Sequence, residues 1–252
     1  MVELPSTLTT VQNRLGNKAG FARTGAFLAL IVSATIVLNL VASLAVVTII
    51  GSDAGSTVTF IAGATGTELS FLLIGVGYLR YRTTFDLPIQ QPDRTTASYV
   101  LAGLVASFVT AFVSLGITDV LLPSIEFSPG YMKYTNLNTP TGPGLVLAVV
   151  LSLTVIGPIE EFFFRGLIQG RIEAVLRPTG AIGVAGLTFA LFHVYPVLLL
   201  SPPPIVIAHM TVYYSLMGIV FGWVYHQTDT LLAPVLVHGV FNAVIFTIPL
   251  WT

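Results

Sequence analysis

Long apolar runs separated by short polar segments are the dominant pattern along the chain. A helix that crosses a bilayer core of about 30 Å needs about 20 mostly apolar residues. The runs that meet or approach this length cover residues 25–50, 58–79, 97–118, 144–159, 179–195, 205–225 and 230–250. The fourth run continues directly into a charged motif. The pattern predicts an all-α, polytopic transmembrane helix bundle of about seven spans.

The polar segments between these runs indicate a single transmembrane domain. Residues 1–24 are polar and are expected to form an N-terminal tail, followed by one domain over residues 25–250. The longest loop, at residues 123–143, is rich in turn-forming residues and is expected to lie on the membrane surface. No internal repeat or second domain is evident.

Composition supports the membrane assignment and excludes several kinds of site. The chain is 54% hydrophobic and 8% charged, whereas about a quarter of the residues in a soluble domain are charged. So few charges could not cover a water-facing surface, so the lipid bilayer is an expected partner. The ten basic residues are scattered, which argues against nucleic acid as a partner, and the absence of cysteine excludes disulfides and thiolate sites.

The basic residues alternate between the two sides of the predicted bundle. Cytoplasmic loops carry an excess of Lys and Arg. The ends assigned to the cytoplasm on this rule carry Arg14, Lys18, Arg23, Arg80, Arg82, Arg94, Arg171 and Arg177, whereas the intervening loops carry only Lys133. The rule therefore places the N-terminus in the cytoplasm of an integral protein of the cell membrane.

The segment VIGPIEEFFFRGLIQGR, residues 155–171, places three charges in an apolar span. Each would cost roughly 2.5–3.5 kcal/mol at a helix centre, so they must face the bundle interior or a wet cavity. On a helix, Glu161 and Arg165 are four residues apart and can neutralise each other. Glu160 points about 100° away from Glu161 and is left for another partner. The alternative is a purely structural role, in which these charges form an ion pair that holds neighbouring helices together.

Two later spans carry polar residues that could be this partner. Phe189 and His193 share one helix face, and so do His238 and Asn242, because each pair is four residues apart. Two histidines, an asparagine and a free glutamate are the groups needed to activate a water and to stabilise an oxyanion. Non-catalytic packing, as in an immunity or scaffold protein, and a proton-coupled transporter are the alternatives, since intramembrane Glu and His also mark proton relays.

Helix rise predicts that these residues can meet. Counting about 1.5 Å per residue from the cytoplasmic ends of their spans puts Glu160, His193, His238 and Asn242 in one slab of the bilayer, nearer its cytoplasmic half. The count assumes that the fourth helix continues through Gly166 and Gly170.

Three motifs in this order resemble those of the CAAX protease and bacteriocin-processing family of intramembrane proteases, also called the abortive-infection family. The family pattern is Glu-Glu-x-x-x-Arg, then Phe-x-x-x-His, then His-x-x-x-Asn or Asp. Here the motifs are EEFFFR at 160–165, FALFH at 189–193 and HGVFN at 238–242. The resemblance covers roughly residues 144–250, which would form the protease-like core. Family members often have eight spans.

The resemblance implies an all-helical membrane endopeptidase of the type II CAAX prenyl endopeptidase kind, with a cavity open to the cytoplasm. Glu160 would be the general base that activates a water, and His193 would help to hold it. His238 and Asn242 would stabilise the oxyanion. The substrate would be a peptide or protein at the membrane, with prenylated and non-prenylated substrates both open. Three further residues would support the site: Glu161, Arg165 and Phe189.

A metal is the open question about cofactors. Glu160, His193 and His238 could supply three ligands to Zn²⁺ and leave one position open, which is the pattern of catalytic zinc sites. The sequence has no His-Glu-x-x-His helix. We therefore favour water activation without a metal and keep zinc as the alternative.

Two other polar residues lie within predicted spans. Glu68 could line the cavity or pair with Arg165, and we favour a structural role for it over a catalytic one. His209 lies near the outer end of its span and is interpreted as an interfacial or packing histidine.

Overall fold

The computed structural model describes residues 6–51, 55–81, 87–121, 140–199 and 201–248, and every regular element in these ranges is a helix. The expected surface loop at 123–143 lies mostly outside them. Six spans or parts of spans are regular α-helices: α1 (Ser6–Ile50), α2 (Ser56–Tyr81), α3 (Arg94–Leu121), α7 (Pro178–Leu198), α8 (Pro204–Thr228) and α9 (Leu232–Thr247). The fourth span is built from α4 (Pro143–Leu151), a π-helical segment (Ser152–Ile156), α5 (Gly157–Glu161), a second π-helical segment (Phe162–Gln169) and α6 (Gly170–Glu173).

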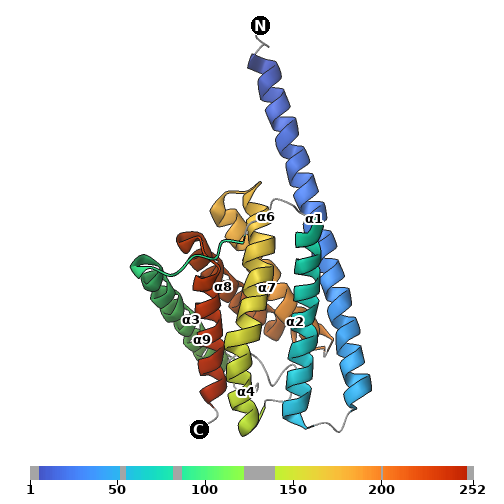
Figure 1. Cartoon of the computed structure of the whole chain (residues 1–252), viewed down its shortest axis with the longest axis vertical. Helices are drawn as coiled ribbons and strands as arrows, with labels where there is room; N and C mark the ends of the chain where they lie inside the picture. Colours follow the sequence, from blue (N-terminus) through green and yellow to red (C-terminus); the bar gives the residue numbers. More distant parts are fainter. Residues whose placement is uncertain (1–5, 52–54, 82–86, 122–139, 200, 249–252) are drawn as a thin grey trace.

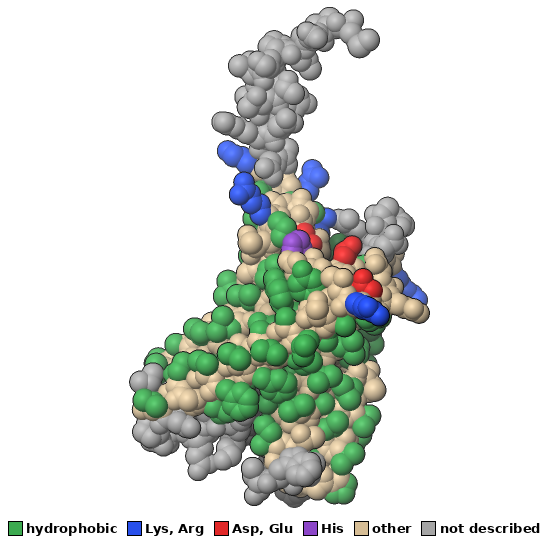
Figure 2. All heavy atoms as spheres, turned by 90° about the vertical axis from the view of Figure 1, so that its left-hand side faces the viewer, with side chains coloured by type: hydrophobic (Ala, Val, Ile, Leu, Met, Phe, Trp, Pro, Cys, Tyr) green, Lys and Arg blue, Asp and Glu red, His purple; other side chains and the backbone are tan. Residues whose placement is uncertain are grey.

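These helices form the expected transmembrane bundle. Six of the described helices are long and apolar enough to cross a membrane, and α9 is a shorter apolar helix. The seventh predicted span, 230–250, is thus observed as 16 helical residues. A broad hydrophobic surface covers the bundle, and charged side chains gather at the end from which α1 extends (Figure 2). The chain is an integral membrane protein.

The first helix begins earlier than the apolar pattern indicates. The apolar run starts at residue 25, but α1 begins at Ser6 and projects beyond the rest of the bundle (Figure 1). The segment suited to a membrane begins only at Lys18. Hydropathy defines where a helix can enter lipid and does not define where its backbone hydrogen bonding begins.

Close contacts between glycines bring the core helices together. Gly186 of α7 and Gly218 of α8 are so close that a methyl group added to Gly218 would lie 2.8 Å from the Gly186 Cα. Gly157 of α5 meets Gly239 of α9, where an added methyl group would lie 3.2 Å from the Gly239 backbone. Small residues allow membrane helices to approach closely. The second contact places His238, next to Gly239, beside the Glu160–Glu161 segment.

The second and fourth spans run side by side in the same direction (Figure 1). Phe71 of α2 packs on Phe163, with ring centroids 4.7 Å apart, and on Phe164 at 5.4 Å. Phe162 lies so close to Gly75 that a methyl group added to the glycine would require the Phe162 ring to move. These contacts fix the register of α2 against the charged motif.

Candidate active site

The fourth span is continuous from Pro143 to Glu173, as the depth estimate assumed. However, α5, which carries Glu160 and Glu161, lies between two π-helical segments. Pro158 has no N–H to donate to the preceding turn, and the first widened turn lies directly before it. Single π-helical turns inside α-helices occur frequently at functional sites. Sequence spacing gave no indication of these turns.

Glu161 and Arg165 form the predicted ion pair. Arg165 Nε lies 3.0 Å from Glu161 Oε2, and both side chains are fully buried. Arg165 Nη2 also donates a hydrogen bond of 3.1 Å to the Gly218 carbonyl of α8. The guanidinium carbon lies 5.1 Å from the centroid of the Phe189 ring and 5.4 Å from that of Phe221. The arginine is therefore held by a carboxylate, a carbonyl and two aromatic rings.

His238 lies between the two glutamates. Its Nδ1 is 2.8 Å from Glu161 Oε1, and its Nε2 is 3.9 Å from Glu160 Oε2. The ring stacks on Phe221, with centroids 4.6 Å apart and an interplanar angle of 17°. Because Glu161 is paired with Arg165, its carboxylate accepts a hydrogen bond from Nδ1–H, and Nε2 is directed towards Glu160. The interpretation of Glu161 as a partner of Arg165 alone was therefore incomplete.

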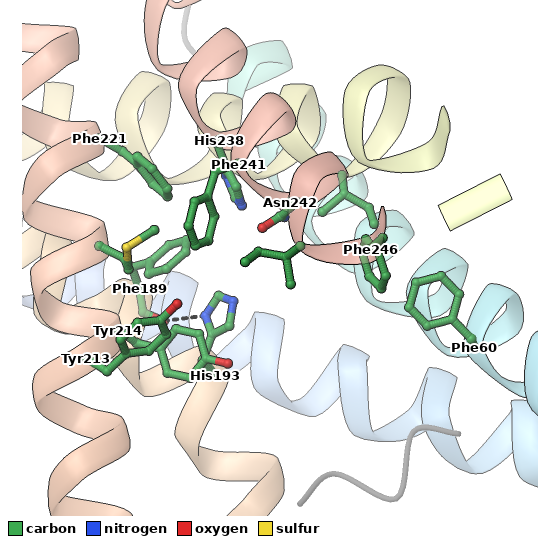
Figure 3. Close-up of a pocket in the computed structure, with 13 residues that line it drawn as sticks. Phe60, Phe189, His193, Tyr213, Tyr214, Phe221, His238, Phe241, Asn242 and Phe246 are labelled. Carbon is green, nitrogen blue, oxygen red and sulfur yellow. Dashed lines mark hydrogen bonds between the residues drawn. The ribbon is translucent and has the colours of Figure 1, made fainter. Parts of the chain in front are cut away.

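His193 is oriented by its own helix and by aromatic neighbours. Nδ1 is 2.9 Å from the Phe189 carbonyl, and the ring stacks on Tyr214 of α8 with centroids 4.2 Å apart. Figure 3 shows the ring across a pocket from His238 and Asn242. Since the Phe189 carbonyl can only accept, Nδ1 donates the hydrogen bond, and Nε2 is the nitrogen left for a water or a substrate.

Two adjoining cavities bring the candidate residues together. The smaller, of about 150 Å³, contains His193, His238 and Asn242 within an aromatic lining that includes Phe221 and Phe241. The larger, of about 410 Å³, contains Glu160 and His193. His193 lines both cavities, so it connects Glu160 on one side with Asn242 on the other.

Glu68 and His209, the remaining acidic residue and the remaining histidine within the predicted spans, do not pair with Arg165. Glu68 of α2 is 3% exposed and lines the larger cavity together with Glu160 and His193. His209 Nε2 lies 3.2 Å from Ser114 Oγ of α3, which fits the expected packing role. Sequence reasoning also missed Tyr214 and Phe221, the rings that stack on the two histidines. Aromatic residues are common in apolar helices, so no sequence signal distinguished these two.

The arrangement does not fit the zinc site considered from the sequence. Among the residues that the structure describes, no three His, Asp or Glu side chains converge as metal ligands would. We therefore derive no step through a metal.

Comparison with known proteins agrees with the motifs. Residues 142–244 match the family model described as type II CAAX prenyl endopeptidase Rce1-like. No curated protein and no solved structure gives a significant match. The matched segment contains all three motifs and both close glycine pairs, and it leaves out α1, α2 and α3. Over residues 142–244 the chain is therefore similar to the type II CAAX prenyl endopeptidases, a family of membrane proteases, which supports the resemblance that the three motifs indicate.

Proposed function

We propose that this protein is an intramembrane endopeptidase that hydrolyses a peptide bond of a membrane-associated peptide or protein, with a water activated by Glu160 and His193. The family match supports peptide-bond hydrolysis and makes prenylated CAAX-type proteins the first substrates to test. The geometry around His238 supports the assignment of roles.

The observation that carries the proposal is the position of His238 between two carboxylates with different surroundings. Glu161 is held by Arg165 and by His238 Nδ1, whereas Glu160 Oε2 is buried without a hydrogen-bond partner among the described residues. Glu161 is therefore suited to orient the histidine. Glu160 keeps an oxygen available for a water in the larger cavity.

The residues can perform hydrolysis in two steps. Glu160 removes a proton from a water that His193 helps to hold, and the oxygen attacks the scissile carbonyl carbon. The carbonyl oxygen becomes an oxyanion on the side of His238 and Asn242. There His238 Nε2–H and the Asn242 side-chain amide donate hydrogen bonds to it, and such donors are most effective in a buried site.

Charge balance supports this division of roles. The ion pairs set two carboxylates, Glu160 and Glu161, against the Arg165 guanidinium and His238, which is charged only when it is protonated. A buried group of four charges without a net charge avoids the large cost of an unpaired ion. Glu161 then accepts from Nδ1–H, which leaves Nε2–H for the oxyanion.

We further propose that the N-terminus is cytoplasmic and that substrates reach the site from that side. Lys18 and Arg23 lie in α1, and charged side chains gather at the end of the bundle from which α1 extends (Figure 2). Arg80 and Arg171 lie in the last turns of α2 and α6. The positive-inside rule assigns this end to the cytoplasm.

A peptidase assay in detergent tests the function. The wild-type protein is compared with Glu160→Gln on internally quenched peptides that end in a CAAX sequence, with and without a prenylated cysteine. We expect cleavage by the wild type and a loss of about 10²-fold or more in the variant, since general base catalysis contributes about 10²–10⁴-fold. Unchanged cleavage by a folded Glu160→Gln protein would rule out the proposed mechanism. A parallel loss of activity and thermal stability would instead support the purely structural role.

A further inference from the structure

A second carboxyl group faces the proposed catalytic glutamate from outside the family-matched segment. Glu68 of α2 lines the larger cavity together with Glu160, and each residue has a buried Oε2 without a hydrogen-bond partner among the described residues. Glu68 is 3% exposed and Glu160 is 7% exposed. The two carboxyl groups interact electrostatically across this space. A buried polar group is normally hydrogen-bonded, so two carboxyl groups that line one cavity, each with a buried oxygen that makes no hydrogen bond among the described residues, call for a ligand or a proton.

Helix register explains why Glu68 lies at the level of Glu160. The second and fourth spans run in the same direction, and Phe71 contacts Phe163 at 4.7 Å. Glu68 precedes Phe71 by three residues, and Glu160 precedes Phe163 by three. Residues three apart lie on neighbouring turns of the same face. The contact between Phe71 and Phe163 therefore places both carboxyl groups at the same depth in the bundle, each about one helical turn from the contact.

The described lining of the larger cavity includes neither Lys nor Arg. His238, which is 3.9 Å from Glu160, lines the smaller cavity instead. The hydroxyl group of Tyr195, which lines the same cavity, donates its hydrogen bond of 2.6 Å to Asn39 Oδ1. Two negative charges in such a space repel each other, and one proton held by the pair removes the repulsion. The cavity is therefore suited to hold a proton beside the reacting water.

We propose that Glu68 is a second catalytic residue, the general acid that protonates the leaving amine of the cleaved peptide bond. This inference rests on the proposed peptidase function. Pairs of carboxyl groups in different environments commonly divide acid and base roles in hydrolysis. Glu160, beside His238, takes the base role, and Glu68, on the opposite helix, takes the acid role.

Glu160 and Glu68 together account for every proton that is transferred in the reaction. Glu160 accepts a proton from water while the water oxygen bonds to the carbonyl carbon. When the tetrahedral intermediate collapses, the C–N bond breaks and the nitrogen takes the proton of Glu68, which becomes a carboxylate. The proton on Glu160 then passes to Glu68 within the cavity. The products, an acid and an amine, leave as carboxylate and ammonium, and both glutamates are restored.

The need for a general acid depends on the leaving group, and this dependence gives the test. An amine leaves poorly unless it is protonated, whereas a nitrophenolate leaves without a proton. Wild type, Glu68→Gln and Glu160→Gln are each assayed on a peptide and on the nitrophenyl ester of the same acyl segment. We expect Glu68→Gln to lose about 10²-fold or more on the peptide and to stay within about threefold of wild type on the ester, because only the amide needs the acid. We expect Glu160→Gln to lose activity on both substrates, because both need an activated water.

Control variants separate chemistry from folding. Glu68→Asp keeps an acid one methylene shorter and should retain more peptide cleavage than Glu68→Gln. Ser70→Ala removes another buried polar group of α2, whose hydroxyl donates a hydrogen bond of 2.8 Å to the Gly66 carbonyl of its own helix, and this variant should cleave both substrates normally.

The outcomes distinguish this inference from the proposed function. Equal losses of Glu68→Gln on peptide and ester, or full peptide cleavage by this variant, would overturn the acid role while Glu160→Gln still tests the base. Failure of the wild type to cleave either substrate would overturn both proposals. If Glu68→Gln is too unstable to assay, the peptide-to-ester activity ratio of Glu68→Leu, which also lacks an acid, decides: a ratio equal to that of wild type overturns the acid role.

Discussion

His238 Nδ1 lies 2.8 Å from Glu161 Oε1, so the second glutamate of the pair orients the histidine. Glu161 also lies 3.0 Å from Arg165 Nε. The chain Arg165–Glu161–His238 therefore connects the fourth span to α9 through buried charges. Glu160, the preceding residue, stands 3.9 Å from the other nitrogen of the same ring. Adjacent glutamates thus have separate roles because they face different atoms of one imidazole.

The buried Glu161–Arg165 pair gives a prediction about stability. We expect Arg165→Met to destabilise the protein by about 3–5 kcal/mol, since it leaves the Glu161 carboxylate buried with a weaker set of partners. The double variant Glu161→Gln, Arg165→Met should be less destabilised than the sum of the two single variants, because no unpaired charge remains. Unfolding in detergent, followed by fluorescence or by proteolysis, measures each free energy. Strictly additive effects would show that the two charges do not interact.

The same substitutions separate stability from the orientation of His238. In the double variant His238 loses its charged partner at Nδ1. We expect this protein to be folded and to cleave peptides poorly, with a larger drop in kcat than change in KM. Wild-type turnover by the double variant would show that Glu161 does not act through His238.

Asn242 gives a prediction about transition-state stabilisation. It lines the smaller cavity with His193 and His238, and Figure 3 shows its side-chain oxygen directed towards the His238 ring. Removing one oxyanion donor costs about 10²–10³-fold in kcat. We expect Asn242→Ala to lower kcat by this order while KM changes little. Asn242→Asp should be less impaired, because the family motif accepts either residue, and equal impairment of both variants would contradict the assignment.

The contact between Gly218 and Gly186 gives a prediction about packing. A methyl group on Gly218 would lie 2.8 Å from the Gly186 Cα and 3.1 Å from its carbonyl oxygen. We expect Gly218→Ala to destabilise the protein by about 1–3 kcal/mol, because overpacking forces the helices apart. It should also lower activity, since the Gly218 carbonyl accepts a hydrogen bond from Arg165. Thermal unfolding and peptide cleavage are measured on the same preparation.

Gly183→Ala is the matched control for this variant. Gly183 lies on the same helix as Gly186, and an added methyl group would meet no atom within 4 Å. We expect its stability to equal or exceed that of wild type, because alanine favours a helix over glycine by about 1 kcal/mol. Equal stability of the two alanine variants would show that the close helix contact is unimportant.

The arrangement of the His, Asp and Glu side chains gives a prediction about metal dependence. Since no three of these side chains converge as ligands among the described residues, we expect peptide cleavage to persist after incubation with a strong zinc chelator. Elemental analysis of the active protein provides the second measurement. Loss of activity on chelation that zinc alone restores, with stoichiometric zinc in the active protein, would restore the zinc alternative.

The sequence predicted the fold class, the motif-bearing spans and one contact within the site. Apolar runs predicted the membrane helices because the bilayer imposes a length and a polarity on every span. The spacing of Glu161 and Arg165 predicted their ion pair because both lie on one helix, where local geometry decides which side chains meet. The free-energy cost of placing charged side chains in an apolar span identified this segment as the candidate site.

Contacts between different spans depended on the tertiary structure. Sequence spacing could not show that His238 binds Glu161, since the two residues are 77 positions apart and meet only because Gly157 and Gly239 allow α5 and α9 to approach. Nor could it place Glu68 beside Glu160, which depends on the aromatic register between α2 and the fourth span. Periodicity reports the face on which a residue lies, whereas the packing of side chains between helices decides which faces meet and at what depth.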